Sequence, residues 1–175
     1  NSFLPDYKLN FAENLLSKKD NSKAITFISE DGFKKIKTWK NLNEDTSKLI
    51  QLFNKLKIKN VDRVAGYMPN TIENVEGFLA TSAIGAIWSS CSPDFGVSGV
   101  IERFSQINPK ILLITDRYYY NGKEINIVER IPELLKKIKS IKQVIICSYP
   151  GKKYLKINLS IKKVKFLKWE EKDKF

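Results

Sequence analysis

Apolar residues along this chain follow two spacings, the short runs typical of strands and the three-to-four-residue spacing typical of helices. From residue 61 to residue 123 the order is strand, helix, strand, helix, strand. The expected strands are Val61–Tyr67, Trp88–Ser92 and Lys110–Thr115, and the expected helices are Thr71–Ile84 and one that starts after Gly96. Strands that alternate with helices of this length are joined by right-handed crossovers. The pattern therefore predicts an α/β fold with a largely parallel sheet and flanking helices.

The first sixty residues have a different pattern, which predicts a short helix and a β-hairpin ahead of the sheet. Asn10–Leu16 is expected to form a short amphipathic helix that its first residue caps. Two β-type runs, Ala24–Ser29 and Phe33–Trp39, are joined around Asp31-Gly32, a dipeptide that favours hairpin turns. A helix of three to four turns is expected over Asn43–Lys57.

Signals for helix ends and loops complete the pattern. Asn70 is the predicted cap of the Thr71–Ile84 helix, and Gly85 marks its predicted end. The remaining expected elements are a polar, aromatic loop at Asp116–Lys123, a helix at Ile127–Ile138, a strand at Gln143–Ser148 and lysine-rich extended segments from Lys152 onward.

The length of 175 residues fits one domain or slightly more, and 42% of the residues are hydrophobic, which is enough to fill a core. The chain begins at Asn1 rather than Met and stops at Phe175 inside a lysine-rich stretch. We therefore expect it to be a piece of a longer protein.

The net charge of +12 comes from 27 Lys and only four Arg, set against 19 acidic residues. Proteins that read nucleic acid generally rely on Arg for bidentate contacts. The balance therefore favours solvated lysine faces and no nucleic-acid partner. A non-catalytic basic module that docks nucleic acid or an acidic partner is the alternative of another class.

Cys91 and Cys147 each lie in an apolar run that is predicted to be a strand. Two separated cysteines, without a disulfide-dense pattern or a secretion signal, are typical of buried, reduced thiols in a cytosolic protein. No apolar run approaches the roughly 18 residues that a membrane span needs. A soluble, cytoplasmic protein without a membrane partner is expected.

The chain contains no histidine, which removes the commonest general base and the commonest metal ligand. No cluster of Cys and acidic residues has the spacing of a zinc site, so no metal ligand is expected. Gly96 and Gly99 lie at a helix start but lack both the dinucleotide fingerprint and the Gly-Lys-Ser/Thr loop. A turn and close helix packing are therefore the favoured interpretation of these glycines.

Candidate binding residues follow the expected ends of two strands. By position alone, Asp94 suits a general base and Asp116 a ribose ligand, because doubly wound sheets bind ligands just past their strands. Helix capping or solvent exposure is the simpler interpretation of both. Lys123 beside Tyr118–Tyr120 combines a cation with aromatic faces, which suits a phosphate and an adenine ring.

Several segments together resemble the acyl-CoA synthetases, which are acyl-adenylate-forming enzymes. The matching segments are Phe3–Pro5, Leu9–Leu16, Lys37–Trp39, Asp62–Asn70, Gly77–Gly96, Tyr120–Lys123 and Trp169–Glu171. The run from Trp88 to Gly96 is similar to the acetoacetate-CoA ligases (acetoacetyl-CoA synthetases) rather than to the acetate enzymes, whose corresponding turn is richer in glycine. The resemblance extends over nearly the whole chain.

This resemblance implies a two-step reaction. ATP and acetoacetate would give acetoacetyl-adenylate and pyrophosphate, with Mg²⁺ neutralising the phosphates, and coenzyme A would then displace AMP to form acetoacetyl-CoA. In that family the phosphate loop, the adenine and ribose motifs and the catalytic lysine lie beyond the matched region. No catalytic residue is therefore expected in this chain, which alone should be inactive. The alternative within the class is a synthetase for another short acyl chain, such as acetyl, propionyl or butyryl.

The resemblance also implies where coenzyme A would bind. In related acetate enzymes the turn after the second strand and the basic loop after the third bind the nucleotide end of coenzyme A. The corresponding candidate residues here are Asp94, Phe95, Tyr120, Asn121, Gly122 and Lys123. Tyr120 stands where the acetate enzymes have Arg, and Asp94 stands where they have Gly. Lys123 keeps a cation and is the leading candidate.

Residues 1–175 would then form an incomplete N-terminal part of the adenylate-forming large domain, with the remainder of its own chain as a partner. Within it, residues 1–60 would hold the helix, hairpin and second helix, and residues 61–150 the alternating unit. Residues 151–175 would start the next, lysine-rich β segment.

Overall fold

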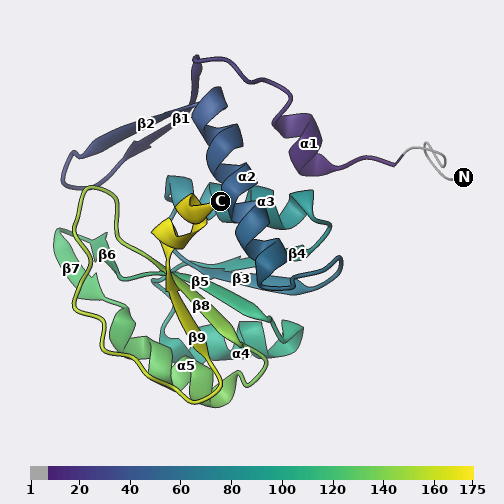
Figure 1. Cartoon of the computed structure of the whole chain (residues 1–175). Coiled ribbons are helices and arrows are strands. Elements are labelled where there is room, and N and C mark those ends of the chain that lie inside the picture. The colour runs from purple at the N-terminus through teal and green to yellow at the C-terminus, as the bar shows by residue number, and fades with distance from the viewer. Residues whose placement is uncertain (1–7) are drawn as a thin grey trace, which may run out of the picture.

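A five-stranded parallel sheet forms the centre of the computed structural model, which describes residues 8–175 (Figure 1). Across the sheet the strands follow the order β4 (Ile87–Cys91), β3 (Arg63–Tyr67), β5 (Ile111–Thr115), β8 (Gln143–Cys147) and β9 (Lys165–Lys168). Every neighbouring pair is parallel. The predicted fold class is confirmed.

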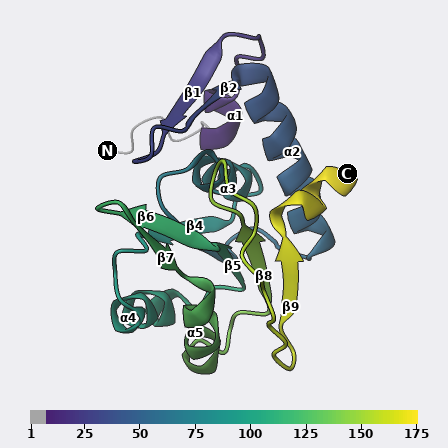
Figure 2. The same ribbon diagram turned by 90° about the vertical axis from the view of Figure 1, so that its left-hand side faces the viewer.

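Helices cover both faces of this sheet (Figures 1 and 2). On one face lie α4 (Val97–Ile107) and α5 (Ile131–Lys137), the latter preceded by the 3₁₀ turn η1 (Val128–Arg130). On the other lie α2 (Trp39–Lys55) and α3 (Ile72–Ala83). All five residues of the central strand β5 are buried, because helices shield both of its faces.

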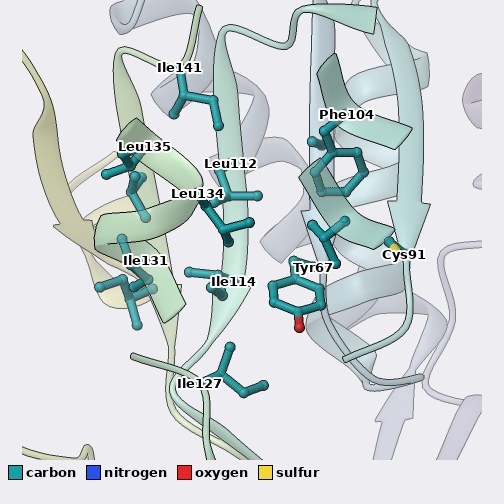
Figure 3. Close-up of a cluster of buried hydrophobic side chains, with 14 of the residues drawn as sticks. Tyr67, Cys91, Phe104, Leu112, Ile114, Ile127, Ile131, Leu134, Leu135 and Ile141 are labelled. Carbon is teal, nitrogen blue, oxygen red and sulfur yellow. The ribbon is translucent and has the colours of Figure 1, made fainter. Parts of the chain in front are cut away.

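The two faces of the sheet have separate hydrophobic cores. Figure 3 shows the core beneath α4 and α5, in which Tyr67, Phe104, Leu112, Ile114 and Ile131 lie together. The opposite core joins strand residues to α2 and α3 and includes Leu49, Phe53, Val64, Leu113 and Ile145. Cys91 and Cys147 are buried and free, as predicted.

The N-terminal elements match their prediction. The side chain of Asn10 accepts hydrogen bonds from two backbone N–H groups and so caps α1 (Phe11–Leu15). Strands β1 (Lys23–Ile28) and β2 (Lys34–Thr38) pair as an antiparallel hairpin. The segment Phe3–Pro5 lies outside the described residues.

Two predicted helix starts are wrong. Helix α2 begins at Trp39 rather than Asn43, because the hydroxyl of Thr38 accepts a hydrogen bond from the N–H of Asn41 at 3.2 Å. Helix α3 is capped by Thr71 rather than Asn70. Both Asn and Thr can cap a helix, and the path of the chain decides which one reaches the free amides. The predicted end of α3 is confirmed, since Gly85 has a φ of +69°.

The predicted loop at Asp116–Lys123 is also wrong, because this segment forms an antiparallel hairpin. Strand β6 (Arg117–Tyr120) pairs with β7 (Lys123–Asn126). The two turn residues, Asn121 and Gly122, have φ values of +50° and +71°. Asn-Gly is the favoured dipeptide for such a two-residue turn, so the local signal was present in the sequence.

The C-terminal segment is less extended than predicted. After β9 the chain turns into a short 3₁₀ helix, η2 (Trp169–Lys174), whose buried Lys172 amine lies 3.2 Å from a carboxylate oxygen of Asp45 in α2. This ion pair fixes the end of the described chain to the α2 face. No helix within residues 8–175 is both long and apolar enough to span a membrane.

Candidate functional site

The carboxyl ends of the parallel strands meet at one edge of the sheet, where open α/β sheets bind their ligands. Two connections leave this edge: the Ser92–Phe95 turn, which follows β4, and the β6–β7 hairpin, which follows β5, with β3 between these two strands in the sheet. Both groups of predicted site residues therefore lie in connections at the carboxyl edge. This placement is what a binding role would require, and the role itself stays a prediction.

The Ser92–Phe95 turn is ordered by its own short contacts. The hydroxyl of Ser92 donates to a carboxylate oxygen of Asp94 at 2.8 Å, and the N–H of Phe95 donates to the carbonyl of Ser92 at 3.1 Å. Asp94 is exposed, and the Phe95 side chain keeps 42% of its surface exposed. The turn thus presents a carboxylate and an aromatic ring to solvent.

Two clefts adjoin this turn. Phe95 forms part of a cleft of about 610 Å³ between β4 and α4, where the guanidinium of Arg103 lies 4.3 Å from the centre of the Phe95 ring. Asp94 lines a smaller cleft of about 230 Å³ at the ends of β3 and β4. Gly96 occupies the N-cap position of α4, which fits a turn residue, whereas Gly99 lies inside the first turn of the helix itself.

Arg130 and Tyr67 make a second set of contacts with the Ser92–Phe95 turn. Arg130, just before α5, donates through Nη1 to the hydroxyl of Tyr67 at 2.5 Å and to the carbonyl of Pro93 at 2.8 Å. The Tyr67 hydroxyl in turn donates to the carbonyl of Phe95 at 2.9 Å. Figure 3 shows this hydroxyl directed away from Phe104 and Leu112, toward the carboxyl edge.

In the contact between Tyr67 and Arg130, a neutral hydroxyl lies beside a permanent positive charge. Burial raises the pKa of Tyr67, and the hydrogen bond and positive charge of Arg130 lower it only in part. The phenol therefore keeps its proton and can donate it in the hydrogen bond to Phe95. Sequence reasoning missed both residues; the one available signal was that Arg130 is among only four arginines in a lysine-rich chain.

The hairpin turn is more exposed than the Ser92–Phe95 turn. Tyr120 keeps 60% of its surface exposed, and Asn121, Gly122 and Lys123 are exposed as well. The N–H of Gly122 donates to a carboxylate oxygen of Glu30 at 3.1 Å, which ties this turn to the β1–β2 hairpin. Within residues 8–175 no hydrogen bond or ion pair joins this turn to Ser92–Phe95.

Asp116 is neither exposed nor available as a ribose ligand. Its side chain is fully buried and accepts hydrogen bonds from the N–H groups of Tyr149 and Leu155 at 3.0 and 2.8 Å. The guanidinium of Arg117 lies 3.1 Å from the same carboxylate. Asp116 therefore holds the chain segments around β5 and β8 together, a role that its position in the sequence did not reveal.

The candidate residues suit an adenine nucleotide end better than a metal. An exposed cation at Lys123 and exposed rings at Tyr120 and Phe95 fit a phosphate and a flat base. In the part of the chain that the structure describes, no three His, Cys, Asp or Glu side chains come together as metal ligands. We assign no magnesium ligand to these residues.

Comparison with known proteins defines the class. Residues 13–171 match the family described as AMP-binding enzymes, and the chain belongs to that family. It is similar to the acetoacetyl-CoA synthetase of Xenopus tropicalis, with 44% identity over 144 residues, which are 81% of this chain and 21% of that protein. The acetoacetyl-coenzyme A synthetase of Rhizobium meliloti is 42% identical over 149 residues, which are 85% of this chain and 23% of that protein.

A solved structure agrees with the sequence comparison. The acetoacetyl-CoA synthetase from Streptomyces lividans matches the fold with a TM-score of 0.82 and 32% identity, over 93% of this chain and 24% of that chain. The predicted resemblance is confirmed. The chain spans about a fifth to a quarter of the length of these relatives.

Proposed function

We propose that this chain is the N-terminal part of an ATP-dependent ligase that activates acetoacetate as an acyl-adenylate and transfers it to coenzyme A. The observation that carries the proposal is the 44% identity to an acetoacetyl-CoA synthetase over 81% of the chain, within the AMP-binding enzyme family. The products would be acetoacetyl-CoA, AMP and pyrophosphate. Its partners would be these small molecules and the remainder of its own chain, in the cytoplasm.

In this proposal the described residues bind rather than catalyse. The parallel sheet supports the carboxyl edge, and the exposed turn residues of that edge hold the nucleotide end of coenzyme A. Lys123 would attract a phosphate, while the rings of Tyr120 and Phe95 would contact the base. When bound, coenzyme A supplies the thiol that displaces AMP. ATP and Mg²⁺ would bind through parts of the protein outside this segment.

Substrate assays on the full-length protein test the proposal. Thioester formation is measured with acetate, propionate, butyrate and acetoacetate in the presence of ATP, Mg²⁺ and coenzyme A. We expect the highest kcat/KM with acetoacetate. Equal values for all four acids would overturn the assignment to acetoacetate and leave a synthetase for short acyl chains in general. No thioester with any acid would overturn the proposed reaction.

The reading frame beyond Phe175 gives an independent test. A phosphate loop rich in Ser, Thr and Gly is expected there, because backbone amides and hydroxyls of such a loop bind the phosphates of ATP. A full reading frame without such a loop would contradict the proposed reaction class.

A further inference from the structure

We infer that Arg130 is a positioning residue for the coenzyme A step and acts on the Ser92–Phe95 turn together with Tyr67. The inference rests on the proposed function, because it concerns the same turn. Neither Arg130 nor Tyr67 is among the candidate binding residues that the family resemblance implies, although Tyr67 lies in the matching segment Asp62–Asn70. The observation behind it is that Arg130 bonds the Pro93 carbonyl in the Ser92–Phe95 turn and also faces the ring of Tyr118 in β6, the strand that carries Tyr120.

The contacts with the turn are direct. Arg130 Nη1 donates to the Pro93 carbonyl at 2.8 Å, on one side of Asp94. Its second acceptor, the Tyr67 hydroxyl at 2.5 Å, donates to the Phe95 carbonyl at 2.9 Å, on the other side. The carbonyls that flank Asp94 are therefore both fixed by one arginine and one tyrosine. The exposed Asp94 and Phe95 side chains project from a backbone that is held on both sides.

The contact with the hairpin comes from the same guanidinium. Its central carbon lies 6.0 Å from the ring centre of Tyr118, which is in β6 two residues before Tyr120. A cation at this distance from an aromatic ring is attracted to its face. Arg130 thus links the Ser92–Phe95 turn to the strand that carries Tyr120, and fixes the two halves of the proposed coenzyme A site relative to each other.

The shape of the side chain matters to this role. A guanidinium is planar and always charged, so it can bond two oxygens and face a ring in one fixed orientation. The ammonium of Lys is a point charge and can keep only part of this arrangement. We therefore expect Arg130→Lys to retain some function and Arg130→Gln to retain less.

Arg63 offers a matched control, because it lies at the opposite end of β3 from Tyr67. Arg63 begins β3, and its Nε donates to the carbonyl of Ile107 at 2.7 Å. Like Arg130 it is half-buried and donates to a backbone carbonyl, but it lies at the amino edge of the sheet. Arg63→Gln should cost comparable stability without moving the candidate turn.

The experiment uses the full-length protein and separates the two half-reactions. Acid-dependent exchange of pyrophosphate into ATP reports adenylate formation, which needs no coenzyme A, and thioester formation reports the second step. For Arg130→Gln and Tyr67→Phe we expect the KM for coenzyme A to rise roughly tenfold, equivalent to about 1.4 kcal/mol. Pyrophosphate exchange should stay within about twofold of wild type. The double variant should be no worse than the poorer single one, because both changes release the same turn.

The outcomes are distinguishable. An unchanged KM for coenzyme A in a folded Arg130→Gln or Tyr67→Phe protein would overturn the inference. An equal rise in the KM for ATP would also overturn it, and so would a tenfold rise in the KM for coenzyme A in Arg63→Gln. Either result would mean a general loss of structure. If Arg130→Gln does not fold, Tyr67→Phe and Arg130→Lys carry the same comparison. A wild-type protein that makes no thioester would instead refute the proposed function.

Discussion

Replacement of Asp116 by Ala tests whether this buried carboxylate holds the chain segments around β5 and β8 together. In the folded protein this carboxylate is fully buried and accepts hydrogen bonds from the N–H groups of Tyr149 and Leu155. It also forms an ion pair with the buried guanidinium of Arg117 at 3.1 Å. The variant Asp116→Ala removes the acceptor for all three donors at once.

The size of the destabilisation depends on the partners that Arg117 keeps when the Asp116 carboxylate is removed. Removing one partner of a buried ion pair typically costs about 3–5 kcal/mol, because the other charge stays buried without compensation. Arg117 keeps two other acceptors, a carboxylate oxygen of Glu124 at 3.1 Å and the carbonyl of Lys153 at 2.6 Å. These contacts reduce the loss, so we expect a destabilisation of about 3 kcal/mol.

Equilibrium urea unfolding of the 175-residue chain measures this loss. With a urea slope of about 2 kcal/mol per molar, a destabilisation of 3 kcal/mol lowers the midpoint by about 1.5 M. Asp94→Ala makes the same change of charge at an exposed site and should shift the free energy of unfolding by less than about 0.5 kcal/mol. If the two variants lose similar stability, the buried Asp116 carboxylate does not hold its neighbouring segments together.

Three further predictions concern other parts of the chain. Gly66→Ala should cost about 1–3 kcal/mol in urea unfolding, because its Cβ would lie 2.5 Å from Cζ2 of Trp88; a neutral result would refute this close packing. Burial raises the pKa of Glu76 to about 7 from an ordinary 4.5, so the folded chain binds the proton more tightly and loses stability as the pH rises from about 5 to 7. Glu76→Gln cannot ionise, and its stability relative to wild type should rise by about 2–3 kcal/mol between pH 5 and pH 8; the same difference at both pH values would contradict this. In the full-length enzyme, Lys123→Ala should raise the KM for coenzyme A without slowing pyrophosphate exchange, whereas Lys136→Ala, on an exposed face of α5, should change neither; an unchanged KM would remove Lys123 from the site.

Much of the fold was predictable because its signals are local. The spacing of apolar residues identified the parallel strands β3, β5 and β8 and the helices between them, and Gly85 marked the end of α3 as expected. The β6–β7 hairpin was missed although its Asn-Gly turn is a local signal, because the polar residues around it resemble a loop.

The candidate site was predictable only in part. Position after a strand indicated Asp94, and the tyrosines next to it indicated Lys123. Resemblance to a family added Phe95 and implied that all three bind coenzyme A. Their position after strands explains why they reach the carboxyl edge. Nothing in the spacing of the chain could have shown that Asp116 is buried, since its backbone donors lie 33 and 39 residues further along. Its environment depends on how β8 and the segment after it pack against β5.

The sequence by itself determined the α/β class, the alternation of strands and helices and the membership suggested by the run from Trp88 to Gly96. Only the tertiary structure decided that Arg130 contacts both the Ser92–Phe95 turn and the strand that carries Tyr120. Its acceptors are 63 and 37 residues away along the chain, at Tyr67 and Pro93. Local pattern fixes which face of each element is apolar, but a parallel sheet gathers the ends of distant strands at one edge. Contacts made at that edge are set by the order of the strands, which no local pattern contains.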